Sequence, residues 1–207
     1  MNSVYTDLYP YEIGWTQYGP EETENAREIG QYLVNNGVNI DSAYAILGNM
    51  QTESHLNPGQ FGYHAGTDLT SNSFGLGQWD PGTKVSNYLT VQGIPVTQAN
   101  LENGFYQLDY LLGDTGQWST HYVDMNTGYS SYYNLTVPIY PTMQDFLTDT
   151  QASLQDKTCA WMVYWERPQP GSEAARIQHA EHWAGEHVIT SIIIWLICKA
   201  AIARGRL

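Results

Sequence analysis

The fold is decided by the stretch Gly48-Asn49-Met50-Gln51-Thr52-Glu53-Ser54-His55-Leu56-Asn57-Pro58-Gly59. Before it, apolar residues recur at three- and four-residue spacings, which predicts a helix with Asp41 as its N-cap. The helix is expected to end at Asn57-Pro58-Gly59, because proline lacks an N–H and disfavours helical backbone in the residue before it. Glu53 is therefore predicted to lie in the last turn of a buried helix, where the negative end of the helix disfavours a carboxylate.

A second informative stretch follows about twenty residues later, Ser73-Phe74-Gly75-Leu76-Gly77-Gln78-Trp79-Asp80-Pro81. Two glycines alternate with other residues, which is typical of a strand that a ligand approaches closely. Gln78 offers both a donor and an acceptor, and Trp79 offers a flat stacking face. We expect this stretch to form a binding wall beside Glu53, whose carboxyl group suits proton donation to a leaving-group oxygen.

Together the two stretches resemble the catalytic signature of the lysozyme superfamily, and most closely that of the phage tail lysozyme family. Asn25-Ala26 and Tyr164-Trp165-Glu166-Arg167-Pro168 extend the resemblance over roughly residues 22–187. The resemblance implies an α+β, lysozyme-like fold, mainly helical, with a small β-hairpin or sheet flanking a cleft. It also implies a phage lysin at the virion tail tip, with other tail proteins as partners.

The activity implied by the resemblance is muramidase cleavage of the β-1,4 linkage between N-acetylmuramic acid and N-acetylglucosamine in peptidoglycan. Glu53 would be the general acid. Asp80 and Asp68 are candidates for a second carboxylate, although Asp80 is also a good N-cap or turn residue and Asp68 suits a bond to its own turn. Substrate contacts are expected from Ser73, Gly75, Gln78, Trp79 and Tyr164.

Other functions remain open from the sequence. Lytic transglycosylase chemistry needs only the acid Glu53 and the N-acetyl group of the substrate. An endolysin acting at lysis is a further alternative, as is a non-catalytic glycan-binding or structural tail protein.

Composition narrows the class of protein. The 207 residues suit one domain, and 8 Lys+Arg against 21 Asp+Glu give a net charge of −13, which argues against nucleic-acid binding. The 16 tyrosines and 7 tryptophans suit a sugar-binding surface. Two cysteines make no disulfide framework, and no secretory signal is visible, so export by a holin, lysis or a virion is expected.

No cofactor or metal is predicted. His179, His182, Glu186 and His187 share a helix face, but no cysteine or second histidine cluster completes a ligand set. Glu166 and Arg167 are interpreted as a structural ion pair or as a brace for loop carbonyls.

The chain divides into an N-terminal arm (1–21), the lysozyme-like domain (22–187) and an apolar C-terminal helix (188–207). Within the domain, residues 98–112 are predicted to form a helix, and residues 114–141 a long loop. The C-terminal segment holds no acidic residue and three of the eight cations. It predicts membrane contact through 188–203, with a helix packed in the core or in an assembly as the competing interpretation.

Overall fold

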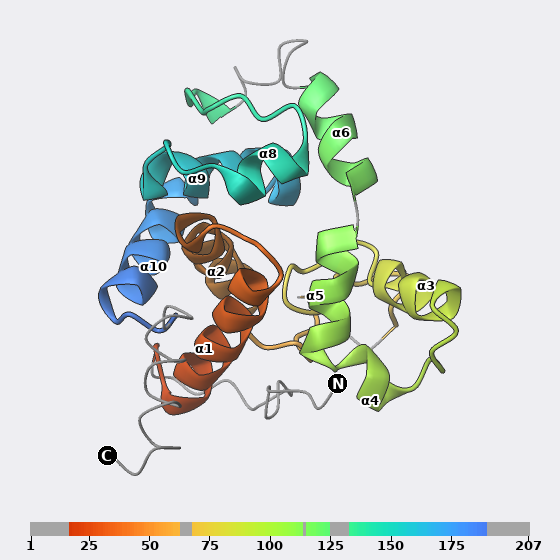
Figure 1. Cartoon of the computed structure of the whole chain (residues 1–207). Helices are drawn as coiled ribbons and strands as arrows, with labels where there is room; N and C mark the ends of the chain where they lie inside the picture. Colours follow the sequence, from red (N-terminus) through yellow and green to blue (C-terminus); the bar gives the residue numbers. More distant parts are fainter. Residues whose placement is uncertain (1–16, 63–67, 114, 125–132, 190–207) are drawn as a thin grey trace.

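The structure is a computed structural model that describes residues 17–62, 68–113, 115–124 and 133–189. Helices α1, α2, α9 and α10 lie on one side and α3, α4 and α5 on the other (Figure 1). The elements are α1 (Pro20–Asn35), α2 (Ile40–Ser54), α3 (Thr83–Val91), α4 (Gln98–Leu101), α5 (Gly104–Gly113), α6 (Thr115–Asp124), α8 (Met143–Thr148), α9 (Leu154–Trp161), the π-helix η2 (Met162–Glu166) and α10 (Glu173–Gly185).

Helix α2 is the centre of the fold, because it packs against α1, α8, α9 and α10. Its N-cap is Asn39, whose side-chain oxygen accepts a hydrogen bond from the Asp41 amide at 3.0 Å, so the prediction of Asp41 as the N-cap is wrong. The helix ends at Ser54, and His55 and Leu56 follow with left-handed φ angles of 55° and 60°. The prediction that Glu53 lies in the last turn is confirmed.

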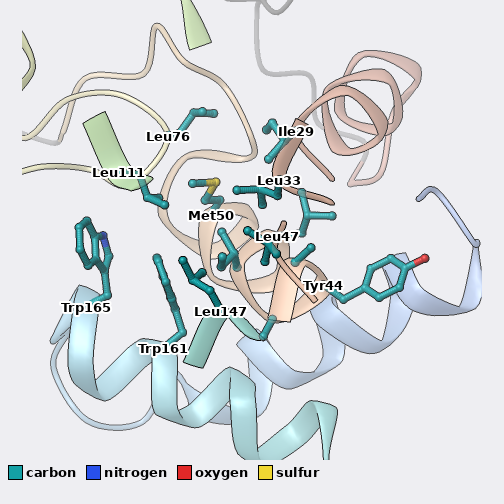
Figure 2. Close-up of a cluster of buried hydrophobic side chains, with 14 of the residues drawn as sticks. Ile29, Leu33, Tyr44, Leu47, Met50, Leu76, Leu111, Leu147, Trp161 and Trp165 are labelled. Carbon is teal, nitrogen blue, oxygen red and sulfur yellow. The ribbon is translucent and has the colours of Figure 1, made fainter. Parts of the chain in front are cut away.

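The hydrophobic core surrounds α2 (Figure 2). Leu47 and Met50 of α2 meet Ile29 and Leu33 of α1 on one side. On the other side lie tryptophans of α9 and η2, with Trp161 and Trp165 stacked at a ring distance of 5.2 Å. The burial of these large side chains supplies the main driving force for folding.

The predicted β-hairpin or sheet is wrong, and so is the α+β fold class. The described residues contain no β-strand, and Phe74 makes only isolated antiparallel bridges, with Phe61 and Trp79. Residues 75–78 form a turn instead, with Gly75 at φ 82° and Gln78 at φ 43°. The backbone of Leu76 in this turn bonds side chains: its amide donates to Gln107, and its carbonyl accepts from Ser54.

Two further predictions about local structure need correction. The helix expected over residues 98–112 is divided into α4 and α5, and the expected loop over 114–141 contains α6. Trp118 explains α6: it is fully buried, stacks on Tyr164 at 4.9 Å and donates its indole N–H to the Tyr140 carbonyl. Tertiary packing thus overrides a polar local sequence.

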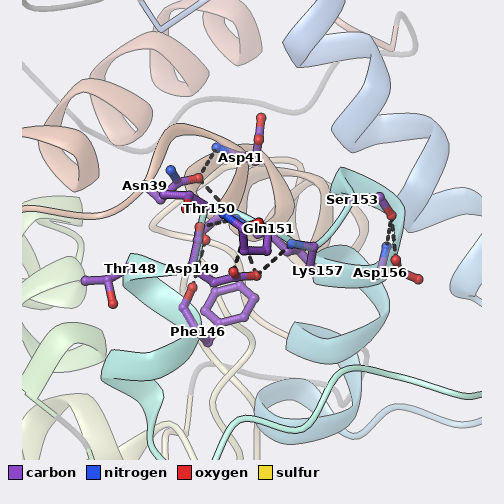
Figure 3. A network of polar contacts seen from close by, with 12 residues as sticks. Asn39, Asp41, Phe146, Thr148, Asp149, Thr150, Gln151, Ser153, Asp156 and Lys157 are labelled. Carbon is purple, nitrogen blue, oxygen red and sulfur yellow. Dashed lines mark hydrogen bonds and ion pairs between the residues drawn. The ribbon is translucent and has the colours of Figure 1, made fainter.

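A polar network ties the start of α2 to α9 (Figure 3). Lys157 is fully buried, and its Nζ donates to Asn39 Oδ1 at 3.1 Å and to the Asp149 carbonyl. The Asp149 carboxylate lies 3.9 Å from the same nitrogen. Burial lowers the pKa of Lys157, and the charge of Asp149 partly opposes this shift.

The terminal predictions fall largely outside the described residues. Residues 1–16 of the arm and 190–207 of the apolar segment are outside them, and with them most of the predicted membrane contact. Val188 and Ile189 are buried, the latter against Gly30 of α1. Among the described residues, no helix is long and apolar enough to span a membrane.

Candidate active site

Glu53 is held by a buried arginine. The Glu53 side chain, 20% exposed, accepts a hydrogen bond from Arg176 Nη2 of α10, and the Arg176 side chain is only 2% exposed. The guanidinium also donates through Nη1 to Asn49 Oδ1 at 2.8 Å and through Nε to Ser172 Oγ at 3.0 Å. Arg176 is therefore fixed on two helices, and it presents its charge to the carboxylate of Glu53.

Close packing of α2 and α10 makes this contact possible. A Cβ on Gly48 would lie 2.6 Å from the Arg176 carbonyl oxygen and 2.7 Å from both the Ala180 amide nitrogen and its Cβ. Only glycine fits at this crossing without a backbone shift. Gly48, one turn before Glu53, thus brings Arg176 within reach of the acid.

A second carboxyl group, that of Glu166, lies at the end of η2. It ends the π-helix η2, where Arg167 turns the chain at φ 52°, and its Oε1 accepts a hydrogen bond from Trp161 Nε1 at 3.1 Å. Burial, and next the charge of Glu53, raise the pKa of Glu166 to about 8, whereas Arg176, Trp161 and Lys84 act in the opposite direction. Glu166 therefore favours its protonated form near neutral pH.

A pocket of about 430 Å³ opens beside this carboxyl group. Its walls come from the turn after Phe74, from α3, from α6 and from the end of η2. The lining residues are Gly77, Gln78, Trp79, Asp80, Lys84, Gln117, Thr120, His121, Trp165, Glu166 and Arg167. The pocket thus joins the Ser73–Pro81 stretch to the Tyr164–Pro168 stretch, and Glu53 is not among its lining residues.

Of the predicted substrate-contacting residues, Gln78 and Trp79 line the pocket. The Gln78 side chain also braces the turn, accepting from Ser73 Oγ at 2.9 Å and donating to the carbonyls of Gln60 and Gly75. Ser73 and Gly75 are not among the residues that line the pocket and serve the same turn. Substrate contact by these two residues stays a prediction.

Each of two tryptophans at the pocket has an indole N–H that lacks a hydrogen-bond partner among the described residues. Trp79 and Trp165 are almost completely buried, and both line it. Within the described part of the chain, neither indole N–H has a hydrogen-bond partner. Unpaired buried donors are costly, and both indole nitrogens are themselves buried rather than exposed in the pocket.

The candidate second carboxylates differ in their surroundings. Asp80 is exposed and lines the pocket, and it is not the N-cap of α3, which is Gly82. Asp68 accepts hydrogen bonds from the amide and hydroxyl of Thr70 and from Ser71, which lower its pKa. The interpretation that Asp68 bonds its own turn is confirmed.

Tyr164 is 2% exposed and belongs to the aromatic core, stacked on Trp118. Its carbonyl accepts from Nδ1 of the pocket residue His121 at 2.6 Å. Tyr164 therefore holds the pocket residue His121 without lining the pocket itself.

The histidines of α10 contact Tyr18 rather than one another. The Tyr18 hydroxyl lies 2.6 Å from Nδ1 of His179, and its ring stacks on His182 at 3.6 Å. Burial lowers the pKa of His179 to about 4. The described residues hold no group of three or more histidine, cysteine or acidic side chains arranged to bind a metal ion.

Sequence reasoning missed the position of Glu166 in the pocket wall. It assigned this residue only a structural role, because Glu166 is 113 residues from Glu53 and its surroundings arise from packing. A signal was present, since Glu166, like Glu53, is an acidic residue at a helix end that is followed by a proline.

Comparisons with known proteins identify the family of this chain. Morphogenesis protein 1 of Bacillus phage B103 is 31% identical over 163 residues, which cover 79% of this chain. The matched region spans 39% of the relative's own length. The sequence profile of the phage tail lysozyme family matches residues 24–186, a range that contains Glu53, the turn and Glu166. This chain belongs to the phage tail lysozyme family.

Proposed function

We propose that this domain cleaves the glycan strands of peptidoglycan, as a muramidase carried by a phage virion and used during penetration of the host cell wall. The observation that carries the proposal is Glu53 at the end of α2, held by the buried guanidinium of Arg176, together with a pocket of about 430 Å³ lined by Gln78, Trp79 and Glu166. Glycoside cleavage needs a carboxyl group that donates a proton to the leaving oxygen.

In the proposed reaction Glu53 is the general acid. Gln78 and Trp79 form the wall on which the sugar lies. Asp80 is the candidate for the carboxylate that stabilises the developing oxocarbenium ion, because it lines the same pocket. The family description and the name of the phage relative support a location on the virion, with the tail tip as the proposed site and other tail proteins as partners.

A zymogram with purified peptidoglycan tests the function. The wild-type chain is expected to clear the gel, and Glu53→Gln to lose about 100-fold or more of the rate. Glu181→Gln is the matched control, since Glu181 is an exposed acid on α10 that only accepts from Gln155. Equal clearing by Glu53→Gln and the control would remove Glu53 from the mechanism.

A wall-pelleting assay separates the non-catalytic alternative. Retained sedimentation with peptidoglycan, together with no clearing by the wild-type chain, would identify a glycan-binding tail protein instead of an enzyme.

A further inference from the structure

A second pocket, of about 490 Å³, adjoins the candidate active site, and we call it the α3 pocket. Its walls come from α3 and α5, which pack against each other (Figure 1). Among the residues that line it are Lys84, Tyr88 and Val91 of α3 and Tyr110 of α5. Lys84 also lines the active-site pocket of about 430 Å³, so the two spaces meet at one side chain.

On the basis of the proposed function, we infer that the α3 pocket binds the stem peptide of peptidoglycan, the short acidic peptide that is attached to muramoyl residues. Lys84 binds a carboxylate of this peptide at the point where the two pockets meet. A glycan strand in the active-site pocket brings its peptide branch past Lys84, because this residue lines both spaces. The substrate of the site is therefore a peptide-bearing strand rather than a bare one.

The α3 pocket follows one face of α3. Lys84, Tyr88 and Val91 recur at the spacing that places side chains in one row along a helix, whereas Val85 and Leu89 are buried on the opposite face. Val91 is apolar and yet 81% exposed. At ~1.5 Å per residue the row from Lys84 to Val91 is about 10 Å long. About three residues of an extended peptide span this length.

Lys84 offers a positive charge that no acid of the described chain pairs with. Arg27, Lys157 and Arg176 each pair with an acidic side chain. The half-buried Lys84 side chain makes neither an ion pair nor a hydrogen bond with any described residue. It is also the second residue of α3, where the positive end of the helix disfavours a cation. An ammonium group placed there suits a carboxylate that a ligand supplies.

The other walls of the α3 pocket suit a peptide with small apolar side chains. The Tyr110 ring packs against Trp79 of the active-site pocket at a ring distance of 5.4 Å and against Tyr88 at 5.7 Å. With Val91, these tyrosines offer apolar surface to alanine methyl groups. In peptidoglycan the lactyl group of the muramoyl residue is amide-linked to the peptide, so the negative charge lies on the peptide and not on the glycan. Charge complementarity with Lys84 therefore favours the peptide, and in a chain of net charge −13 it also offsets repulsion of an acidic polymer.

Binding of two soluble disaccharides to the full ¹⁵N-labelled chain, followed by NMR titration, tests the inference. One ligand is N-acetylglucosaminyl-N-acetylmuramic acid with a tetrapeptide stem, and the other is the same disaccharide with its lactyl group capped as an amide. Neither contains the linkage that a muramidase cleaves, so neither is consumed. The wild-type chain is expected to bind the peptide-bearing ligand more tightly. Lys84→Met should lose about two- to fivefold of this preference, as expected for a partly exposed ion pair.

Arg27→Met is the matched control, because it removes the same charge from α1 and Arg27 lines neither pocket, so it should keep the wild-type preference. Val91→Asp adds an acid at an exposed position of the α3 pocket and should reduce the preference. Equal preference in wild type and Lys84→Met overturns the inference. A matching loss of affinity in Val91→Asp for a peptide-free tetrasaccharide amide does so too, since the α3 pocket would then hold sugar.

The same measurements separate this inference from the proposed function. A stem-peptide preference that depends on Lys84, in a chain that clears no peptidoglycan, refutes only the enzymatic function. Clearing of peptidoglycan by a wild-type chain that binds the two disaccharides equally refutes only the stem-peptide site.

Discussion

Gly48→Ala tests whether the close contact of α2 and α10 builds the site. An added Cβ would lie within 2.7 Å of three atoms of α10, and two of them, the Arg176 carbonyl oxygen and the Ala180 amide nitrogen, belong to the backbone. Backbone atoms in a helix do not yield as a flexible side chain does, so the two helices must separate. Overpacking of this kind costs about 1–3 kcal/mol, and three contacts place the site toward the upper end.

The gain from alanine partly offsets this cost. Replacing glycine within a helix contributes about 0.5–1 kcal/mol of stability. The expected net loss is about 2 kcal/mol, which lowers the melting temperature by about 4–8 °C in a chain of this size. Because Arg176 moves with α10, cleavage of peptidoglycan should fall more than the loss of folded protein explains.

Thermal unfolding followed by circular dichroism is the assay, with Gly185→Ala as the control. Gly185 is the last residue of α10, and a Cβ there meets no atom within 4 Å. The control should melt at or slightly above the wild-type temperature. A Gly48→Ala chain that is as stable as the control would refute the claim that this glycine sets the helix spacing.

Two further predictions concern pH and the reaction products. The pKa of His179 is lowered to about 4 from an ordinary value of 6.5, so its neutral form contributes stability that is complete above pH 6.5 and is lost as the pH falls toward 4. The difference in melting temperature between wild type and His179→Gln should shrink across this window, and a constant difference would refute the assignment. For the products, hydrolysis predicts muramoyl ends that carry ¹⁸O when the digest is run in H₂¹⁸O, whereas anhydro-muramoyl ends in the mass spectrum would establish transglycosylase chemistry instead.

The position of Glu53 could be predicted because its cause is local. The end of α2 can be predicted within a few residues from the spacing of apolar residues and from the helix-terminating stretch Asn57-Pro58-Gly59. The structure agrees with this prediction. The N-cap was misplaced by two residues because Asn39 and Asp41 are both good capping residues. Helix boundaries are the least certain part of such reasoning.

The glycine-rich stretch Ser73–Pro81 shows why the sheet prediction failed although residues of this stretch do line the pocket. Alternation of Gly75 and Gly77 with other residues is compatible both with a strand and with a turn. Gln107, about thirty residues further along the chain, decides between them by accepting from the Leu76 amide and donating to the Pro58 carbonyl. No local sequence pattern predicts that contact of Gln107. The chemistry of Gln78 and Trp79 did not depend on it, and both residues line the pocket.

The contact of Glu53 with Arg176 lies beyond sequence reasoning for a related reason. Arg176 follows Glu53 by more than a hundred residues, and their contact depends on the crossing of α2 and α10 at Gly48. A glycine inside a helix normally weakens it, so its presence one turn before an acidic residue indicates that another segment approaches there. The sequence does not say which segment. Only packing shows that this segment brings a buried guanidinium to the proposed acid.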